Sequence, residues 1–121
     1  MGRQRPRFIS EFSPDIPAEH AELAAIIFAA ERSAETPEVD LHGLDVHDAL
    51  HEIDLFIDRA FIRGDRGVKI IHGAGTGILR KAVREHLKSH EHIQTSVPAS
   101  GAESSGVTIA ILEHNGDVRL K

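Results

Sequence analysis

The 121-residue chain contains no cysteine. Disulfide bonds and thiolate metal sites are therefore excluded. No apolar run approaches the roughly 20 residues that a membrane-spanning helix needs, so we expect no membrane partner. Residues 1–7 are basic, but no long apolar stretch follows them, so a secretory signal is not expected. The length favours one domain with a single core, and we expect a soluble, cytoplasmic protein.

Positive charge is scarce in the first half of the chain. The formal net charge is −5. Residues 1–58 carry 4 basic and 13 acidic side chains, whereas residues 59–88 carry 8 basic and 2 acidic ones. This distribution predicts a basic face on an acidic protein. Such a face is either a contact for an anionic polymer or ordinary solvated surface.

A glycine-rich loop lies inside the basic segment. The apolar run Val68–Ile71 is followed by His72-Gly73-Ala74-Gly75-Thr76-Gly77, and a helical pattern begins at Ile78. Glycine lets the backbone turn sharply and approach a ligand closely. The first N–H groups of a helix attract anions. The pattern therefore predicts a seat for a phosphate or another anion, with His72 as a nearby proton-transfer group.

Glycine-rich loops also occur in nucleotide-binding sites and in plain tight turns. The loop lacks the Gly-Lys-Ser/Thr ending of a P-loop and the glycine spacing of a dinucleotide-binding loop, so neither kind of nucleotide site is expected. The alternative is that the glycines serve only the tight turn between a strand and a helix.

The hydrophobic periodicity predicts three helices and four main strands. The helices are expected after Pro17, between an N-cap at Asp45 and a stop at Gly64, and from Ile78 to Leu87. The strands are expected at residues 39–43, 68–71, 93–97 and 107–112. The strand at 93–97 alternates Ile93, Thr95 and Val97 on one face. Asn115-Gly116 is a hairpin signal for a further short strand at 117–120.

The order strand–helix–strand–helix–strand–strand predicts a two-layer α/β sandwich with a mixed four-stranded sheet, its first two strands being parallel. Residues 39–121 would form this domain. Residues 1–38 would form a basic arm, with Arg3, Arg5 and Arg7 as non-specific phosphate contacts, plus one helix. The apolar stripe of that helix docks either on the domain or on a second copy of the chain.

Three motifs in this order resemble the Smr (small MutS-related) domain. They are Asp40-Leu41-His42-Gly43, then His72-Gly73-x-Gly75-x-Gly77-x-Leu79-Arg80, then Gly106-Val107-Thr108 before the last main strand. The resemblance covers about residues 39–113. This part of the chain is similar to the C-terminal domain of MutS2 proteins. The resemblance suggests a stand-alone Smr protein or an excised domain. The chain departs from the family at Ser104-Ser105-Gly106, where a glycine pair before the last strand is common, and at Gln94-Thr95-Ser96, where an aromatic residue near the third strand is common.

The resemblance implies a fold like the C-terminal domain of translation initiation factor three. It also implies an endonuclease that nicks DNA or cleaves RNA, or a protein that acts on ribosomes. The family's cleavage motif falls on Asp40 and His42. Its glycine motif, linked to catalysis or to substrate binding, falls on His72, Gly73 and Gly75.

The chemistry of the residues agrees with this placement. Residues two apart in a strand share a face, so Asp40 and His42 can point the same way, and neighbouring parallel strand ends would bring His72 close. His42 and His72 could form an acid–base pair. Asp40 could orient a histidine, or hold Mg²⁺ or Mn²⁺. The phosphate would be held by Gly73, Gly75, Thr76, Gly77, Arg80, Lys81 and Arg84.

Several alternatives remain open. RNA could supply its own 2′-hydroxyl as nucleophile without a metal. A non-catalytic module for branched DNA, structured RNA or ribosomes, or a small-molecule phosphate hydrolase, would use the same loop. Asp40 could simply cap a loop or pair with a basic side chain. The spacing of His47 with His51 and of His86 with His90 can chelate zinc, but no third ligand is evident, so these pairs are interpreted as solvated helix faces.

Overall fold

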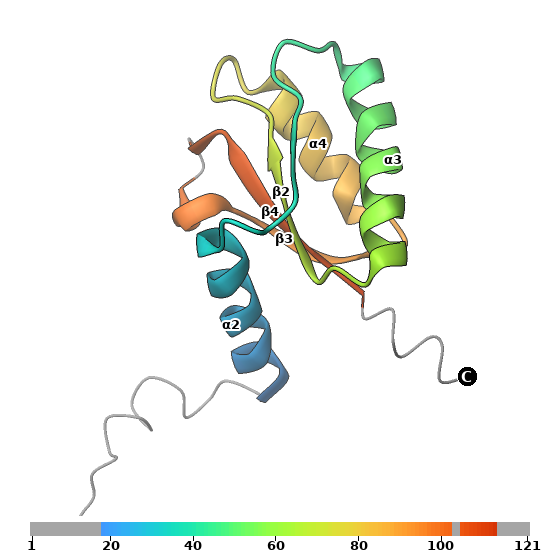
Figure 1. Cartoon of the computed structure of the whole chain (residues 1–121). Helices are drawn as coiled ribbons and strands as arrows, with labels where there is room; N and C mark the ends of the chain where they lie inside the picture. The colour runs from blue at the N-terminus through green and yellow to red at the C-terminus, as the bar shows by residue number, and fades with distance from the viewer. Residues whose placement is uncertain (1–17, 103–104, 114–121) are drawn as a thin grey trace, which may run out of the picture.

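A computed structural model describes residues 18–102 and 105–113 of the chain (Figure 1). The expected N-terminal arm, the turn at Asn115-Gly116 and the strand at 117–120 lie outside these residues. Within the described part, the elements are α2 (Ala18–Arg32), β1 (Glu38–Asp40), α3 (Val46–Arg63), β2 (Gly67–Ile71), α4 (Ile78–Lys88), β3 (Ile93–Pro98), the short 3₁₀ turn η1 (Ala99–Gly101) and β4 (Val107–Leu112). None of the described helices is long and apolar enough to cross a membrane.

The four strands form one mixed sheet in the order β1-β2-β4-β3. β1 and β2 are parallel, whereas β4 is antiparallel to both β2 and β3. This confirms the expected α/β architecture, the strand order along the chain and the parallel first pair. The apolar run at β4 occupies a central position, as its continuous hydrophobicity predicts.

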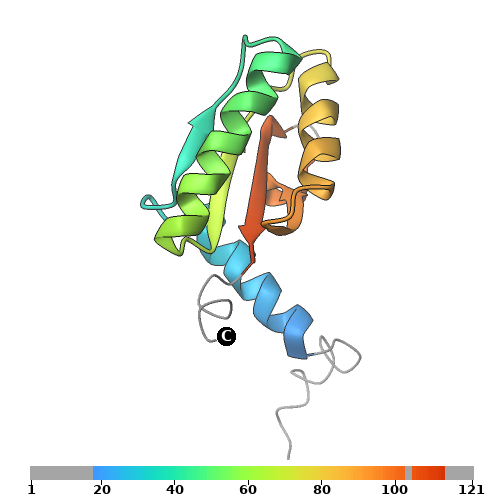
Figure 2. The ribbon, with the colours of Figure 1, turned by 90° about the vertical axis from the view of Figure 1, so that its right-hand side faces the viewer.

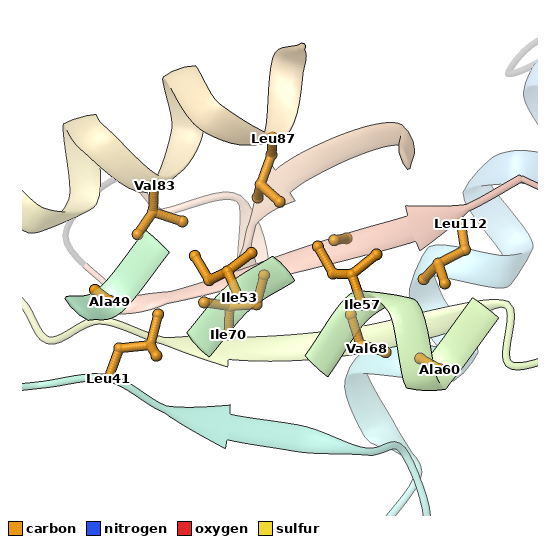
Figure 3. Close-up of a cluster of buried hydrophobic side chains, with 11 residues drawn as sticks. Leu41, Ala49, Ile53, Ile57, Ala60, Val68, Ile70, Val83, Leu87 and Leu112 are labelled. Atoms are coloured by element: carbon orange, nitrogen blue, oxygen red, sulfur yellow. The ribbon is translucent and has the colours of Figure 1, made fainter. Parts of the chain in front are cut away.

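Helices α3 and α4 cover one face of the sheet together (Figures 1 and 2). The expected boundaries of α3 are confirmed, since Asp45 caps its start by accepting a 2.8 Å hydrogen bond from the N–H of Asp48, and Gly64 ends it with a φ of 87°. The side chains of α3 and α4 that point at the sheet make the main core with apolar residues of β2 and β4 (Figure 3). The fully buried members include Ile53, Ile57, Val83 and Leu87.

Helix α2 covers the opposite face of the sheet, so the N-terminal helix docks on the domain of its own chain. Leu23, Ile26 and Ile27 of α2 pack against the cluster formed by Ala30, Ile109 and Ile111. The helix approaches β2 closely at Gly67, where an added Cβ would lie 2.7 Å from the Cβ of Ala30. The helix therefore belongs to the same folded unit as the sheet.

Two strand expectations are wrong in detail. β1 ends at Asp40 and does not extend to Gly43, because residues 42–43 turn toward α3. Ile93, Thr95 and Val97 do not share one face. The register of β3 against β4 shifts between Ile93 and Thr95, and such a bulge turns the residues beyond it to the other face. Ile93 thus packs on the α3–α4 core, whereas Val97 packs on the α2 side.

The close approach of α2 to β2 leads to a stability prediction. Gly67→Ala should lower the free energy of unfolding by about 1–3 kcal/mol, because α2 has to move to admit the methyl group. Urea denaturation measures the change. Gly75→Ala is the matched control, since nothing lies within 4 Å of the Cβ it would add. Equal stability of the two variants would contradict the described packing of α2.

Candidate active site

Asp40, the last residue of β1, and His42 form a hydrogen-bonded pair. Nδ1 of His42 lies 2.6 Å from Oδ1 of Asp40, and the backbone N–H of His42 donates to the same oxygen at 3.1 Å. Both side chains are well exposed, at 70% for His42 and 53% for Asp40. We call this pair the Asp40–His42 dyad.

The dyad forms through a turn and not through strand alternation. Leu41, between the two residues, is fully buried, and its N–H donates to the carbonyl of Ile71 at 2.7 Å. The N–H of Leu44 then donates to the carbonyl of Leu41 at 3.1 Å. An aspartate that accepts a hydrogen bond from the backbone two residues on is a common turn. Leu41 therefore anchors the turn in the core while its neighbours face outward.

The contact between the two side chains sets their protonation. The hydrogen bond from His42 lowers the pKa of Asp40, which keeps the carboxylate ionised. The same hydrogen bond, together with the negative charge of Asp40, raises the pKa of His42. Because Nδ1 is used by Asp40, Nε2 is the ring nitrogen through which His42 can exchange a proton with a ligand.

His72 has a different environment, since only 4% of its surface is exposed. Its Nδ1 lies 3.0 Å from the carbonyl oxygen of Gly73, and its Nε2 lies 2.8 Å from Oγ1 of Thr108. A carbonyl only accepts, so Nδ1 carries the proton and Nε2 accepts from the threonine hydroxyl. Burial lowers the pKa of His72, and the nearby Arg84 and Arg80 lower it further. His72 is therefore neutral and connects the glycine loop to β4.

The glycine loop is held against the start of β4 by its backbone. The N–H groups of His72 and Gly73 both donate to the carbonyl oxygen of Gly106, each at 3.0 Å. Gly73 has a φ of 85° and Gly106 a φ of 80°. A Cβ at Gly106 would lie 3.2 Å from the backbone of Gly73 and Ala74, and a Cβ at Gly73 would lie 3.4 Å from that of His42. The loop, β4 and the dyad thus meet at one end of the sheet.

A hollow of about 650 Å³ opens at this point, lined by residues 42–46 and 72–80. We call it the loop hollow. It brings His42 together with the glycine loop and Arg80 at the start of α4. Asp40 does not line it and reaches it through His42. Of the residues predicted for phosphate binding, Gly73, Gly75, Thr76, Gly77 and Arg80 line the loop hollow.

A second hollow of about 600 Å³ runs between α4 and β3. We call it the basic groove. Lys81 and Arg84, the other two predicted phosphate contacts, line it together with Lys88, Glu85, Ser96 and Pro98. Thr76, Gly77 and Arg80 line both the basic groove and the loop hollow, so the two hollows adjoin each other.

Two residues of this site were not assigned a role from the sequence. Thr108 positions His72 through the hydrogen bond from its hydroxyl group. In the sequence, the sign of this role is a single hydroxyl side chain in the otherwise apolar run Val107–Leu112. Gly106 lies in a matched motif, but its carbonyl contacts with residues 72 and 73 depend on the antiparallel pairing of β2 with β4.

The paired histidines divide into two cases. His47 and His51 are exposed, as expected of a solvated helix face. His86 and His90 are only partly exposed, at 27% and 10% of their side chains, and their Nε2 atoms lie 2.7 Å and 3.6 Å from Oδ1 of Asp54 on α3. They help to pair α4 with α3. Across residues 18–102 and 105–113, no group of three or more histidine and carboxylate side chains could hold a metal ion.

The sequence profile of the Smr domain matches residues 39–113. The chain belongs to the Smr domain family. This range contains the dyad, the glycine loop and β4, so the family's motifs coincide with the residues that meet at the end of the sheet. The recognition made from the motifs is thereby confirmed.

Relatives of the chain carry the same domain. It is 44% identical over 77 residues, 63% of its length, to "Endonuclease MutS2" of Brevibacillus brevis, and 44% identical over 94 residues, 77% of its length, to the protein of the same name from Symbiobacterium thermophilum. The matched part is only 10% and 12% of those relatives, so the chain spans about a tenth of their length.

Two solved structures share the fold. One is the Smr domain of Thermus thermophilus MutS2, with a TM-score of 0.60, 37% identity, and coverage of 64% of this chain and 99% of that one. The other is YdaL, a stand-alone small MutS-related protein from Escherichia coli, with a TM-score of 0.60, 25% identity, and coverage of 72% and 74%. Both support the arrangement of sheet and helices described above.

The dyad leads to a prediction for the pKa of His42. Asp40→Asn removes the charged acceptor, so the pKa of His42 should fall toward its ordinary value of about 6.5. An NMR titration of the imidazole resonances measures the shift. Glu38→Gln is the control, because it removes a nearby carboxylate that does not contact His42. An unchanged pKa in Asp40→Asn would contradict the hydrogen bond between the two side chains.

The contact between His72 and Thr108 leads to a second prediction. Thr108→Val leaves a buried ring nitrogen without a donor and should lower the free energy of unfolding by about 1–3 kcal/mol. Thr108→Ser, which keeps the hydroxyl, should lose less. Thermal denaturation of the two variants compares them. A valine variant at least as stable as the serine variant would rule out a role for this hydrogen bond.

Proposed function

We propose that the chain is an endonuclease that cleaves phosphodiester bonds in nucleic acid at the Asp40–His42 dyad. The observation that carries this proposal is that His42 opens onto the loop hollow beside the glycine loop and Arg80. Phosphodiester cleavage needs a proton acceptor for the nucleophile and positive charge around the phosphoryl oxygens. Both lie here on one surface. The MutS2 relatives, which are named endonucleases, support the same activity.

In this proposal His42 is the proton-transfer group and Asp40 is its positioning residue. The hydrogen bond at 2.6 Å fixes the imidazole and raises its pKa, which makes it a stronger base. Nε2 would take the proton from a 2′-hydroxyl of RNA or from a water molecule. His72 has both ring nitrogens bonded inside the protein, so we assign it to positioning the loop and not to the acid–base pair.

The phosphate would be held by backbone N–H groups of the glycine loop and by Arg80. The neighbouring phosphates of the nucleic-acid strand would contact Lys81 and Arg84 in the basic groove. These cations lie on α4, whose apolar side is buried against the core by Val83 and Leu87, so the helix presents them rigidly. A DNA or RNA strand is the proposed partner, free or on a ribosome.

A divalent ion is compatible with the dyad. Asp40 would be its protein ligand, because the carboxylate is half-exposed and only Oδ1 contacts His42. Mg²⁺ sites often combine one or two protein carboxylates with substrate phosphates. When bound, Mg²⁺ or Mn²⁺ would neutralise charge on the phosphoryl oxygens.

Cleavage of end-labelled RNA and DNA, single-stranded and branched, tests the proposal. His42→Ala should lower the rate by about 10²–10⁴-fold, the usual contribution of a positioned base. His51→Ala, the same change at an exposed histidine of α3, is the matched control and should cleave like the wild type. Activity that survives in His42→Ala would contradict the assignment.

The metal dependence of the same assay separates the two routes. If RNA but not DNA is cleaved in EDTA, and the product carries a 2′,3′-cyclic phosphate, the RNA supplies its own 2′-hydroxyl as the nucleophile. Loss of cleavage in EDTA and recovery with Mg²⁺ or Mn²⁺ indicates an ion at Asp40. If all variants bind nucleic acid and none cleaves it, the chain is a binding module and the catalytic assignment is wrong.

A further inference from the structure

Two large apolar side chains are exposed at the loop hollow and have no role in the proposed chemistry. Leu44 is 39% exposed and Ile78 is 67% exposed. Both line the loop hollow with His42 and Arg80. They come from different parts of the chain, the turn before α3 and the first residue of α4. We call them the apolar rim.

Packing within the domain does not account for the apolar rim. Leu44 precedes the N-cap Asp45, where a hydrophobic staple would pack it on Ala49. The methyl group of an alanine is too small to cover a leucine, and Leu44 remains partly exposed. Ile78 lies off the buried side of α4, which is formed by Val83 and Leu87. Exposed apolar side chains are a common feature of ligand-binding grooves, and these two line the same hollow.

The charges next to the apolar rim indicate what that ligand is. The loop hollow adjoins the basic groove at Thr76, Gly77 and Arg80, which line both. From Arg80 to Lys88 the helix rises by about 12 Å, so its cations can follow a length of polyanionic backbone. An apolar surface that adjoins such a row of cations matches one nucleotide of a strand, whose base is apolar on its faces and whose phosphates are charged.

Base pairing decides whether the face of a base can contact the apolar rim. In a duplex, the faces of each base are covered by its stacked neighbours. Apolar side chains reach them only where a step is unstacked or a base is unpaired and turned out. Proteins that bend duplex DNA insert leucine and isoleucine between base pairs, but this insertion has an unstacking cost that an unpaired base does not require.

We propose that Leu44 and Ile78 bind the face of an unpaired base next to the scissile phosphate. The inference rests on the proposed function and narrows its substrate class to nucleic acid with at least one unpaired nucleotide at the cleavage point. Single strands, loops, bulges and junctions belong to this class. A continuous duplex does not. The basic groove holds the backbone on one side of that nucleotide.

Cleavage of three matched substrates tests the inference. They are a continuous duplex, the same duplex with one bulged nucleotide, and that bulged duplex with an abasic residue at the bulge. The wild type should cleave the bulged duplex at least tenfold faster than the other two, with the cut mapped beside the bulge. Removal of the base needs no protein variant, so it tests the base contact without any risk of misfolding.

Variants of the apolar rim give the second arm. Leu44→Ala/Ile78→Ala should reduce the preference for the bulge by roughly tenfold, the scale of one lost base contact. Ile62→Ala is the matched control, because Ile62 is 76% exposed and does not line the loop hollow. Equal cleavage of duplex and bulge by the wild type, or an unchanged preference in the rim variant, would overturn the inference.

Binding by His42→Ala keeps this inference separate from the proposed function. Its affinity for the three substrates is measured by fluorescence anisotropy. If it binds the bulged duplex best and the rim substitutions remove that preference, the rim binds bases even where no cleavage is seen. If the rim substitutions leave every affinity unchanged, the rim does not contact nucleic acid, and contact with a protein is then its remaining explanation.

Discussion

The carbonyl oxygen of Gly106 is the contact on which the candidate site depends. It accepts hydrogen bonds from the N–H groups of both His72 and Gly73, each at 3.0 Å, and so holds the glycine loop against the residue that precedes β4. The side chain of His72 adds a second tie through Thr108. With the loop fixed from behind, its open side faces His42. The rigid part of the site is therefore buried and uncharged, whereas its reactive part is exposed and charged.

Much of this arrangement was predictable from local chemistry. The cap at Asp45, the stop at Gly64 and the central β4 follow from residue types whose preferences do not depend on distant contacts. The meeting of the Asp40 and glycine-loop motifs follows from two parallel strands that end at one edge. The basic character of α4 follows from cations placed off its apolar stripe. These features fix the sheet, its main helical layer and the position of the site.

What was not predictable depends on tertiary contacts. The bulge that turns Val97 to the other face has no local signal in 93–97, because it is set by the register of β4. His72 resembles a catalytic residue by position, and only the contact with Thr108 from a strand 36 residues away shows that it is buried and bonded. His86 and His90 likewise gain Asp54 as a partner only when α3 and α4 pack together.

We propose that Asp40 activates His42 for proton transfer to and from nucleic acid. The pH dependence of kcat/KM for cleavage, compared between the wild type and Asp40→Asn, tests it most directly. Because Asp40 raises the pKa of His42, the limb of the profile that reports His42 should move to lower pH in the variant. A limb that stays in place while the rate falls would contradict the account, since Asp40 would then act without His42.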